Sequence, residues 1–191
     1  MSIIEDGTGK GNKAEVDDHG RLYTKANIVS HMAHHATYHK NGYILVFETT
    51  LGGSSETPAA FLYNNDANTD YELYWIRGSA DANVEMSAYY GNTYTSGGTT
   101  LTPVNSNAGA PNSITPLAYS GGASADLVVD TTVNKQVDGG FLGAHQPIFS
   151  SYEGGLVLPF QKGITFTVTG TNTDKVKLML GFAIHTAGTK L

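Results

Sequence analysis

The feature that most constrains the fold is a run of alternating apolar and polar residues over positions 154–185. Apolar side chains alternate with threonines over 164–169 and, after the polar stretch GTNTD, occupy every second position over 176–184. A period of two is that of a β-strand with one buried face. Two such strands joined by a short loop rich in Gly, Asn and Asp predict an antiparallel hairpin that forms one wall of a core.

Shorter strand patterns recur along the rest of the chain. The stretches 71–78 and 84–90 are predicted to pair as a second hairpin. Turn-forming residues separate the strands at regular intervals, and the prolines at 103, 111 and 116 exclude central strand positions in the loop-rich middle. The remaining predicted strands cover 43–50, 61–64, 115–119, 126–130, 141–143 and 156–159.

About ten short strands with frequent turns predict an all-β fold, an antiparallel two-sheet sandwich of jelly-roll type. No break in composition divides the chain after residue 43. We therefore expect a sandwich domain over residues 41–191, preceded over 1–40 by an extended N-terminal arm and a His-rich connector.

Composition excludes several classes of function. The net charge is −6 and the only arginines are Arg21 and Arg77, which argues against a nucleic-acid-binding surface. The chain has no cysteine, so it can form neither a disulfide nor a thiolate metal site. No apolar run approaches the roughly 20 residues that span a bilayer, and no apolar leader is present, so we expect no membrane partner and no secretory signal.

Residues 2–25 are rich in Gly, Lys and Asp and have few apolar positions. Such a segment cannot bury enough surface to fold alone. It is either a disordered tail or an extended arm that becomes ordered on a partner, and its scattered apolar residues favour the arm. The residues predicted to bind the partner are Lys10, Lys13, Val16, Arg21, Leu22 and Tyr23.

The segment SHMAHHATYHK, over 30–40, is unusually rich in histidine. On a helix, His31, His35 and His39 would lie one turn apart and could bind a transition metal. No acidic residue lies among them and the H-E-x-x-H pattern is absent. We therefore favour a polar connector whose imidazoles bond to backbone or water. Metal binding and a pH-responsive contact remain as alternatives, and no cofactor is expected.

No catalytic constellation is apparent in the sequence. The G-x-S-x-G pattern of a serine nucleophile is absent. Carboxylates that could pair for glycoside hydrolysis or, with nearby asparagines, ligate calcium lie beside Asn and Gly turns, so a role in solvated turns explains them better. The chain is predicted not to be an enzyme. The candidate carboxylates for glycoside hydrolysis are Asp66, Asp70, Glu72, Asp81 and Glu85. The candidate calcium ligands are Asp66, Asp70, Asn64 and Asn68.

The sequence contains eleven tyrosines. Several, including Tyr94, Tyr119 and Tyr152, fall in predicted loops, where aromatic side chains suit a carbohydrate-binding or protein-binding surface. They suit the core and rim of a sandwich equally well, so the sequence leaves both interpretations open.

Three motifs in a fixed order carry a resemblance to a known family. They are GNKAEVDDHGRLYT at 11–24, FLYNNDANTDYEL at 61–73 and LVLPFQKGITFTV at 156–168, followed by a final alternating strand. In this order they resemble a family of small virion proteins of tailed bacteriophages, often encoded close to the head genes. The match is weak over 91–155, and the His-rich segment has no counterpart in the pattern.

The resemblance implies a capsid cement or decoration protein, commonly a jelly-roll homotrimer on the outer shell. The implied partners are the major capsid protein or other virion proteins and copies of the chain itself. The implied location is the phage particle surface, after synthesis in the host cytoplasm. The alternative is a receptor-binding or glycan-binding module of a tail, fibre or capsid surface.

Overall fold

The structure is a computed structural model of the whole chain. It describes residues 39–51, 54–109, 117–121, 127–130, 135–171 and 173–187, and the backbone of three short strands before them. Contacts divide the chain into two units, Met1–Ser30 and His31–Leu191. The predicted domain boundary at residue 40 stays a prediction.

The first unit contains a small antiparallel sheet that the sequence did not predict. Its strands are β1 (Ile3–Glu5), β2 (Lys13–Val16) and β3 (Leu22–Tyr23), with β2 in the middle. Ile4 lies opposite Ala14 in the register of β1 and β2. The N-terminal segment is therefore a paired strand unit in this structure.

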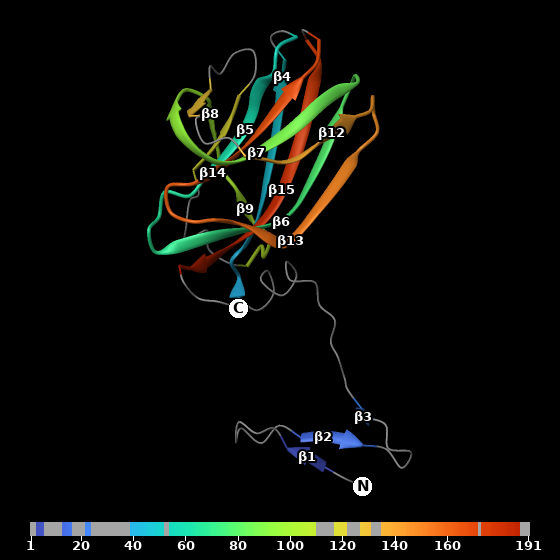
Figure 1. Ribbon diagram of the computed structural model, residues 1–191, viewed down its shortest axis with the longest axis vertical. Coiled ribbons are helices and arrows are strands. Elements are labelled where there is room, and N and C mark those ends of the chain that lie inside the picture. Colours follow the sequence, from blue (N-terminus) through green and yellow to red (C-terminus); the bar gives the residue numbers. More distant parts are fainter. Residues whose placement is uncertain are drawn as a thin grey trace. The chain divides into compact units, whose positions relative to one another are not determined.

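The second unit is a sandwich of two antiparallel sheets, which confirms the predicted all-β fold (Figure 1). The larger sheet has the order β11-β7-β14-β5-β10-β8, with β12 also paired to β7, and the smaller has the order β13-β6-β15-β4-β9. The strand bounds are β4 Gly42–Thr50, β5 Thr57–Tyr63, β6 Thr69–Ala80, β7 Val84–Ser96, β8 Thr99–Leu101, β9 Val104–Asn105, β10 Leu117–Ser120, β11 Val128–Asp130, β12 Lys135–Leu142, β13 Ile148–Leu158, β14 Gly163–Thr169 and β15 Lys175–Thr186.

Eight of these strands follow the jelly-roll order. Strands β4, β6, β13 and β15 belong to the smaller sheet, and β5, β7, β12 and β14 belong to the larger one. Each connection among these eight strands crosses from one sheet to the other, except the one from β7 to β12, which contains the inserted strands and joins neighbours in the larger sheet. This is the connectivity of a jelly roll.

This topology corrects both predicted hairpins. Strands β14 and β15 do not pair: β14 lies between β5 and β7, whereas β15 lies between β4 and β6. Strands β6 and β7 are likewise in different sheets. The short polar loops were identified correctly, but each one carries the chain across the sandwich rather than back alongside the preceding strand.

The core lies between the sheets and uses the apolar faces that the alternation predicted. On β14 Phe166 is buried, and on β15 Leu180 and Phe182 are buried. The rings of Phe47 and Phe166, from opposite sheets, are stacked with centroids 6.4 Å apart. The predicted strand register toward the core is therefore confirmed.

An insertion between β7 and β12 contributes the four short strands β8–β11. Strand β10 extends the larger sheet beside β5, and β11 pairs with the end of β7 beyond β12. On the outer face of the larger sheet, Leu127 and Val129 from the insertion pack on Phe61 of β5. The insertion thus builds a second, smaller hydrophobic cluster outside the main core.

Candidate functional site

The predicted partner-binding residues fall in the N-terminal unit. Lys13 and Val16 lie on β2, while Leu22 and Tyr23 lie on β3, where Val16 is opposite Leu22. Lys10 and Arg21 are outside the described residues. The backbone pairing brings these two strands together in one small sheet.

The histidine prediction is only partly covered by the structure. His39 is exposed, and His31 and His35 lie outside the described residues. Among the described side chains, no group of three His, Cys, Asp or Glu residues is arranged to hold a metal ion.

The acidic and amide residues after β5 form turns, as predicted. The side chain of Asn64 accepts a hydrogen bond from the backbone of Asp66, whose carboxylate accepts one from the backbone of Asn68, at 3.0 and 2.9 Å. The buried amide of Asn64 also donates to the carbonyl of Leu158 on β13. These bonds confirm the turn-forming role of the segment.

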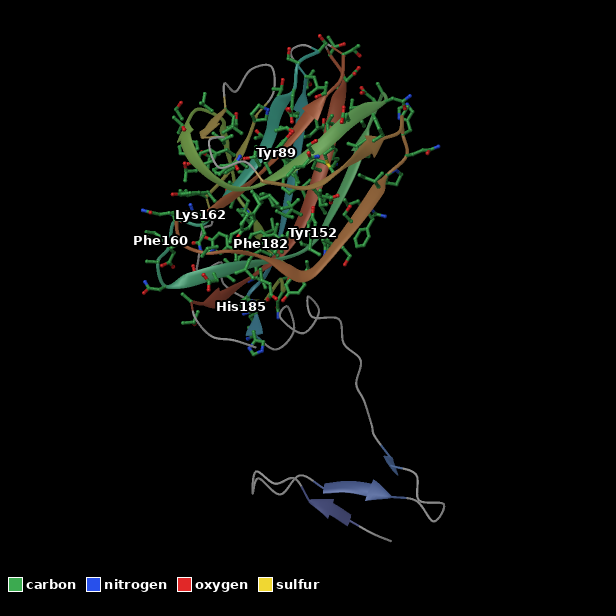
Figure 2. The ribbon with its side chains drawn as sticks, viewed as in Figure 1. Tyr89, Tyr152, Phe160, Lys162, Phe182 and His185 are labelled. Atoms are coloured by element: carbon green, nitrogen blue, oxygen red, sulfur yellow. The ribbon has the colours of Figure 1, made fainter. Side chains whose placement is uncertain are left out.

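A second group of polar side chains lies on the smaller sheet. Glu72 accepts a hydrogen bond from the hydroxyl of Tyr74 at 2.6 Å and lies 2.7 Å from Nε2 of His185. His185, which is labelled in Figure 2, lies near the end of β15. Burial, with the bond to Glu72, raises the pKa of Tyr74 well above its usual range. The contact between His185 and Glu72 links the C-terminal end of β15 to β6.

The three tyrosines predicted in loops lie on strands instead. The rings of Tyr94 on β7 and Tyr119 on β10 stack with centroids 4.3 Å apart. Both pack against the outer hydrophobic cluster. Tyr152 on β13 donates a hydrogen bond to Asp138 at 2.8 Å. The first two therefore help to fix the insertion on the outer face of the larger sheet.

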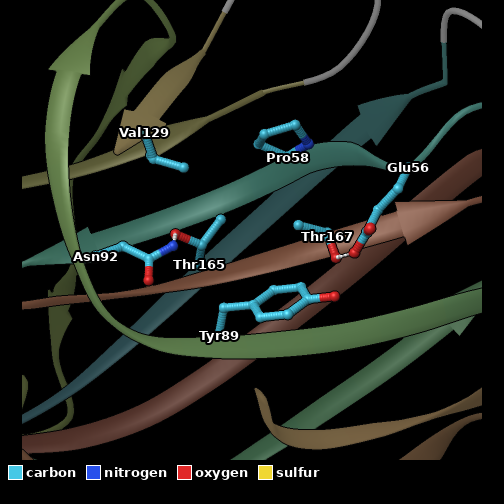
Figure 3. A pocket seen from close by; sticks show the side chains of 7 residues that line it. All are labelled: Glu56, Pro58, Tyr89, Asn92, Val129, Thr165 and Thr167. Carbon is cyan, nitrogen blue, oxygen red and sulfur yellow. Dashed lines mark hydrogen bonds between the residues drawn. The ribbon is translucent and has the colours of Figure 1, made fainter. Parts of the chain in front are cut away.

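Beside the outer hydrophobic cluster, the surface of the larger sheet has a hollow that the sequence analysis did not predict (Figure 3). The hollow has a volume of about 150 Å³. Its lining comes from β5, β7, β11, β14 and the residue before β5, and consists of Glu56, Pro58, Tyr89, Asn92, Val129, Thr165 and Thr167.

Two hydrogen bonds organise the polar groups of the hollow. The hydroxyl of Thr167 donates to Glu56 at 2.5 Å, and the amide of Asn92 donates to the hydroxyl oxygen of Thr165 at 3.0 Å. Partial burial and a hydrogen bond to Glu56 raise the pKa of Tyr89, so its phenol stays protonated at neutral pH. The hollow therefore presents hydroxyl, amide and carboxylate groups around one aromatic ring.

Two β-bulges, one in β7 and one in β5, bring lining residues of the hollow to the outer face of the larger sheet. Ile164 pairs with Tyr90 but Gly163 pairs with Asn92, so Gly91 is an extra residue in β7. Gly91 has a φ of 91°, a conformation that glycine adopts readily. The bulge turns Asn92 onto the same face as Tyr89.

The second irregularity is in β5. Phe166 pairs with Ala60 but Thr167 pairs with Pro58, so Ala59 is the extra residue. Proline has no N–H to donate to the hydrogen-bond ladder of a sheet, so within a sheet it is tolerated at a bulge, where the ladder is interrupted. A proline inside a strand pattern and a Gly-Asn pair near the end of another were the signals from which the hollow could have been anticipated.

Comparisons with known proteins add no assignment: no family model, no curated protein and no solved structure matches this chain. The described residues include no helix long and apolar enough to cross a membrane.

Proposed function

We propose that this chain is a structural protein of a bacteriophage particle that binds the outer surface of the capsid and stabilises it. The observation that carries the proposal is the combination of a jelly-roll sandwich with a separate small strand unit at the N-terminal end. The proposal includes no catalytic role. Its partners are the major capsid protein or another virion protein, and its location is the particle surface after synthesis in the host cytoplasm.

The N-terminal unit supports the proposal because it is too small to be stable alone. Its strands have three, four and two residues, whereas a small sheet needs a hydrophobic face packed on another element to be stable. Within the described part of the chain, β1 and β3 each pair only with β2. Their outer edges therefore offer backbone groups to a strand of a partner.

Exposed apolar side chains support assembly with copies of the chain. Phe149 and Phe141 are 63% and 73% exposed, and Val104 is 64% exposed. Large apolar groups left in water favour burial at an interface. We propose a homotrimer, a closed arrangement in which each copy covers part of its neighbour.

A receptor-binding or glycan-binding module of a tail, fibre or capsid surface is the second candidate. The observation that favours it is the polar hollow around Tyr89. Electron microscopy of virions carrying a labelled copy distinguishes a cement protein, which decorates the shell, from a module of the tail or fibre, which does not. A glycan-binding module on the capsid surface would decorate the shell without raising the heat resistance of the particles.

The test of the capsid role uses particles that lack this protein. Full-length chain, a chain without residues 2–25, and the variant Ala14→Pro are added, and occupancy and resistance to heat are measured. Ala14 lies in the middle strand of the small sheet, opposite Ile4. Proline there removes a backbone donor, whereas the control Ala14→Thr keeps it.

We expect the full-length chain and Ala14→Thr to decorate and stabilise the particles. The chain without residues 2–25 and the variant Ala14→Pro should bind the particles weakly, although their sandwich domains should unfold at the same denaturant concentration as that of the full-length chain. Equal decoration by the truncated chain would remove the docking role of the N-terminal unit. Failure of the full-length chain to bind or stabilise any particle would refute the capsid role itself.

A further inference from the structure

The hollow on the outer face of the larger sheet contains side chains that are buried although they point away from the core. On β14, Thr165 and Thr167 point away from the core, since they alternate with Phe166. Outward residues of a sandwich strand normally face solvent. Here Thr165 is 0% exposed, because the insertion and the neighbouring side chains cover this part of the face.

The walls of the hollow are apolar on one side. Val129 of β11 belongs to the outer hydrophobic cluster, which also contains Phe61, and the ring of Pro58 lies beside it (Figure 3). The ring of Tyr89 forms part of the opposite side. A ligand in the hollow is therefore bordered by a flat aromatic ring and by aliphatic carbon.

The polar groups retain hydrogen-bonding capacity after their internal bonds are counted. Asn92 is 1% exposed and its amide nitrogen is used by Thr165, yet its buried Oδ1 accepts no hydrogen bond from the described residues. A buried polar atom without a partner is costly. A ligand that donates a hydrogen bond to Oδ1 removes that cost.

The same accounting finds an acceptor at the other end of the hollow. Glu56 accepts hydrogen bonds from Thr167 and from the phenol of Tyr89. Its carboxylate has about four lone pairs, so it can accept further hydrogen bonds. The hollow thus offers an acceptor at each end, which suits a ligand that donates hydrogen bonds at two points.

Charge and spacing narrow the class of ligand. Glu56 is the only charged residue among those lining the hollow, so anions are disfavoured. Thr165 and Thr167 are two residues apart on one strand, roughly 7 Å, and each contacts one of the two acceptors. One metal ion, with ligands at about 2.5 Å, cannot reach both acceptor groups in this arrangement.

We propose that this hollow binds a single neutral sugar ring, the terminal residue of a glycan. Hydroxyls around the edge of the ring reach Asn92 and Glu56 together, and the C–H face of the ring rests against Tyr89. The volume of the hollow is only about 150 Å³, which suits one ring rather than a chain of them. The inference rests on the hollow alone and holds for either candidate function.

The test titrates the full-length chain, labelled with ¹⁵N, with methyl glycosides of glucose, galactose, mannose and N-acetylglucosamine. We expect at least one glycoside to give saturable shifts of the backbone amides of Thr165 and Thr167 and of the side-chain amide of Asn92. Because the ligand is neutral, the affinity should change little with salt.

Two variants change groups at the rim without disturbing the core. Glu56→Gln replaces a charged acceptor and should weaken binding roughly tenfold, and Tyr89→Ala removes the ring face and should weaken it at least as much. Their matched controls are Glu48→Gln and Phe149→Ala, which change an exposed carboxylate and an exposed ring on the smaller sheet. Both controls should bind as the unaltered chain does.

Three results would overturn the proposal. The first is no shift with any glycoside up to its solubility limit. The second is binding that neither Glu56→Gln nor Tyr89→Ala weakens, since the sugar would then be bound elsewhere. The third is binding of methylammonium, lost in Glu56→Gln and in high salt, while the glycosides leave the same signals unchanged. Attachment to capsids is measured in a separate experiment. A chain that fails to bind capsids can therefore still be tested for binding of glycosides.

Discussion

The two sheets of the sandwich share one core but differ in what covers their outer faces. On the larger sheet, the outward residues Thr165 and Phe61 are completely buried. On the smaller sheet, the outward residues Phe149 and Val46 are 63% and 45% exposed. The insertion after β7 makes the difference, since Leu127 and Val129 pack on the larger sheet.

This contrast shows that the outward face of a strand takes its character from the segment that covers it. The smaller sheet keeps an apolar outer face, where Trp75 stacks on Phe149 with ring centroids 6.3 Å apart. A Cβ on Gly181 would lie 2.3 Å from the Trp75 indole, so the glycine makes room for the ring. The larger sheet instead has a polar hollow beside a buried cluster.

The largest expected effect tests the core that both sheets share. Phe166→Ala and Leu180→Ala, one in each sheet, should each lower the free energy of unfolding by roughly 2–5 kcal/mol, because both side chains are fully buried. Urea denaturation measures the change. A loss below about 0.5 kcal/mol at both positions would mean that these faces do not point inward.

Next in size is a change that loosens the covering of the larger sheet. Gly121 follows β10, and a Cβ there would lie 1.8 Å from the carbonyl oxygen of Pro58. Gly121→Ala should lower the free energy of unfolding by about 1–3 kcal/mol. The matched control is Gly140→Ala, because nothing lies within 4 Å of a Cβ at that position. Equal stability of the two variants would contradict the close packing of the insertion.

An alkaline titration probes the buried side of the smaller sheet. Burial raises the pKa of Tyr71, Tyr74 and Tyr152 above the usual range. Above about pH 10 the unfolded chain releases phenolic protons that the folded chain keeps. The free energy of unfolding should therefore be insensitive to these groups below about pH 10 and fall as the pH rises further.

Urea denaturation between about pH 9 and 11.5, with absorbance of the phenolate followed in parallel, measures this effect. The three tyrosines should ionise only as the protein unfolds. If all eleven tyrosines ionise together near pH 10 in a chain that is still folded, the buried assignment is wrong.

The smallest expected effect on folding is on the exposed face of the smaller sheet. Phe149→Ala should change the free energy of unfolding by no more than about 0.5 kcal/mol, because the side chain is largely in water. Light scattering should nevertheless show weaker self-association. Unchanged association would argue against this face as the contact between copies.

The candidate site was the part least accessible from the sequence. None of the residues lining the hollow was singled out, because its two ends depend on bulges at Ala59 and Gly91 that shift the strand register. Each bulge reverses which residues face outward beyond it. Period-two reasoning assumes an unbroken strand, so it assigns Asn92 to the wrong face.

The sequence by itself determined where most strands lie and which side of each faces the core. Both follow from the local pleat of the backbone, so the alternation in β14 and β15 was enough to identify their buried residues. Only the tertiary structure decided which strands are neighbours, because a strand with one apolar face can bury that face equally well in either sheet. The contacts that settle the choice join residues far apart in the chain, as Asn92 and Thr165 are.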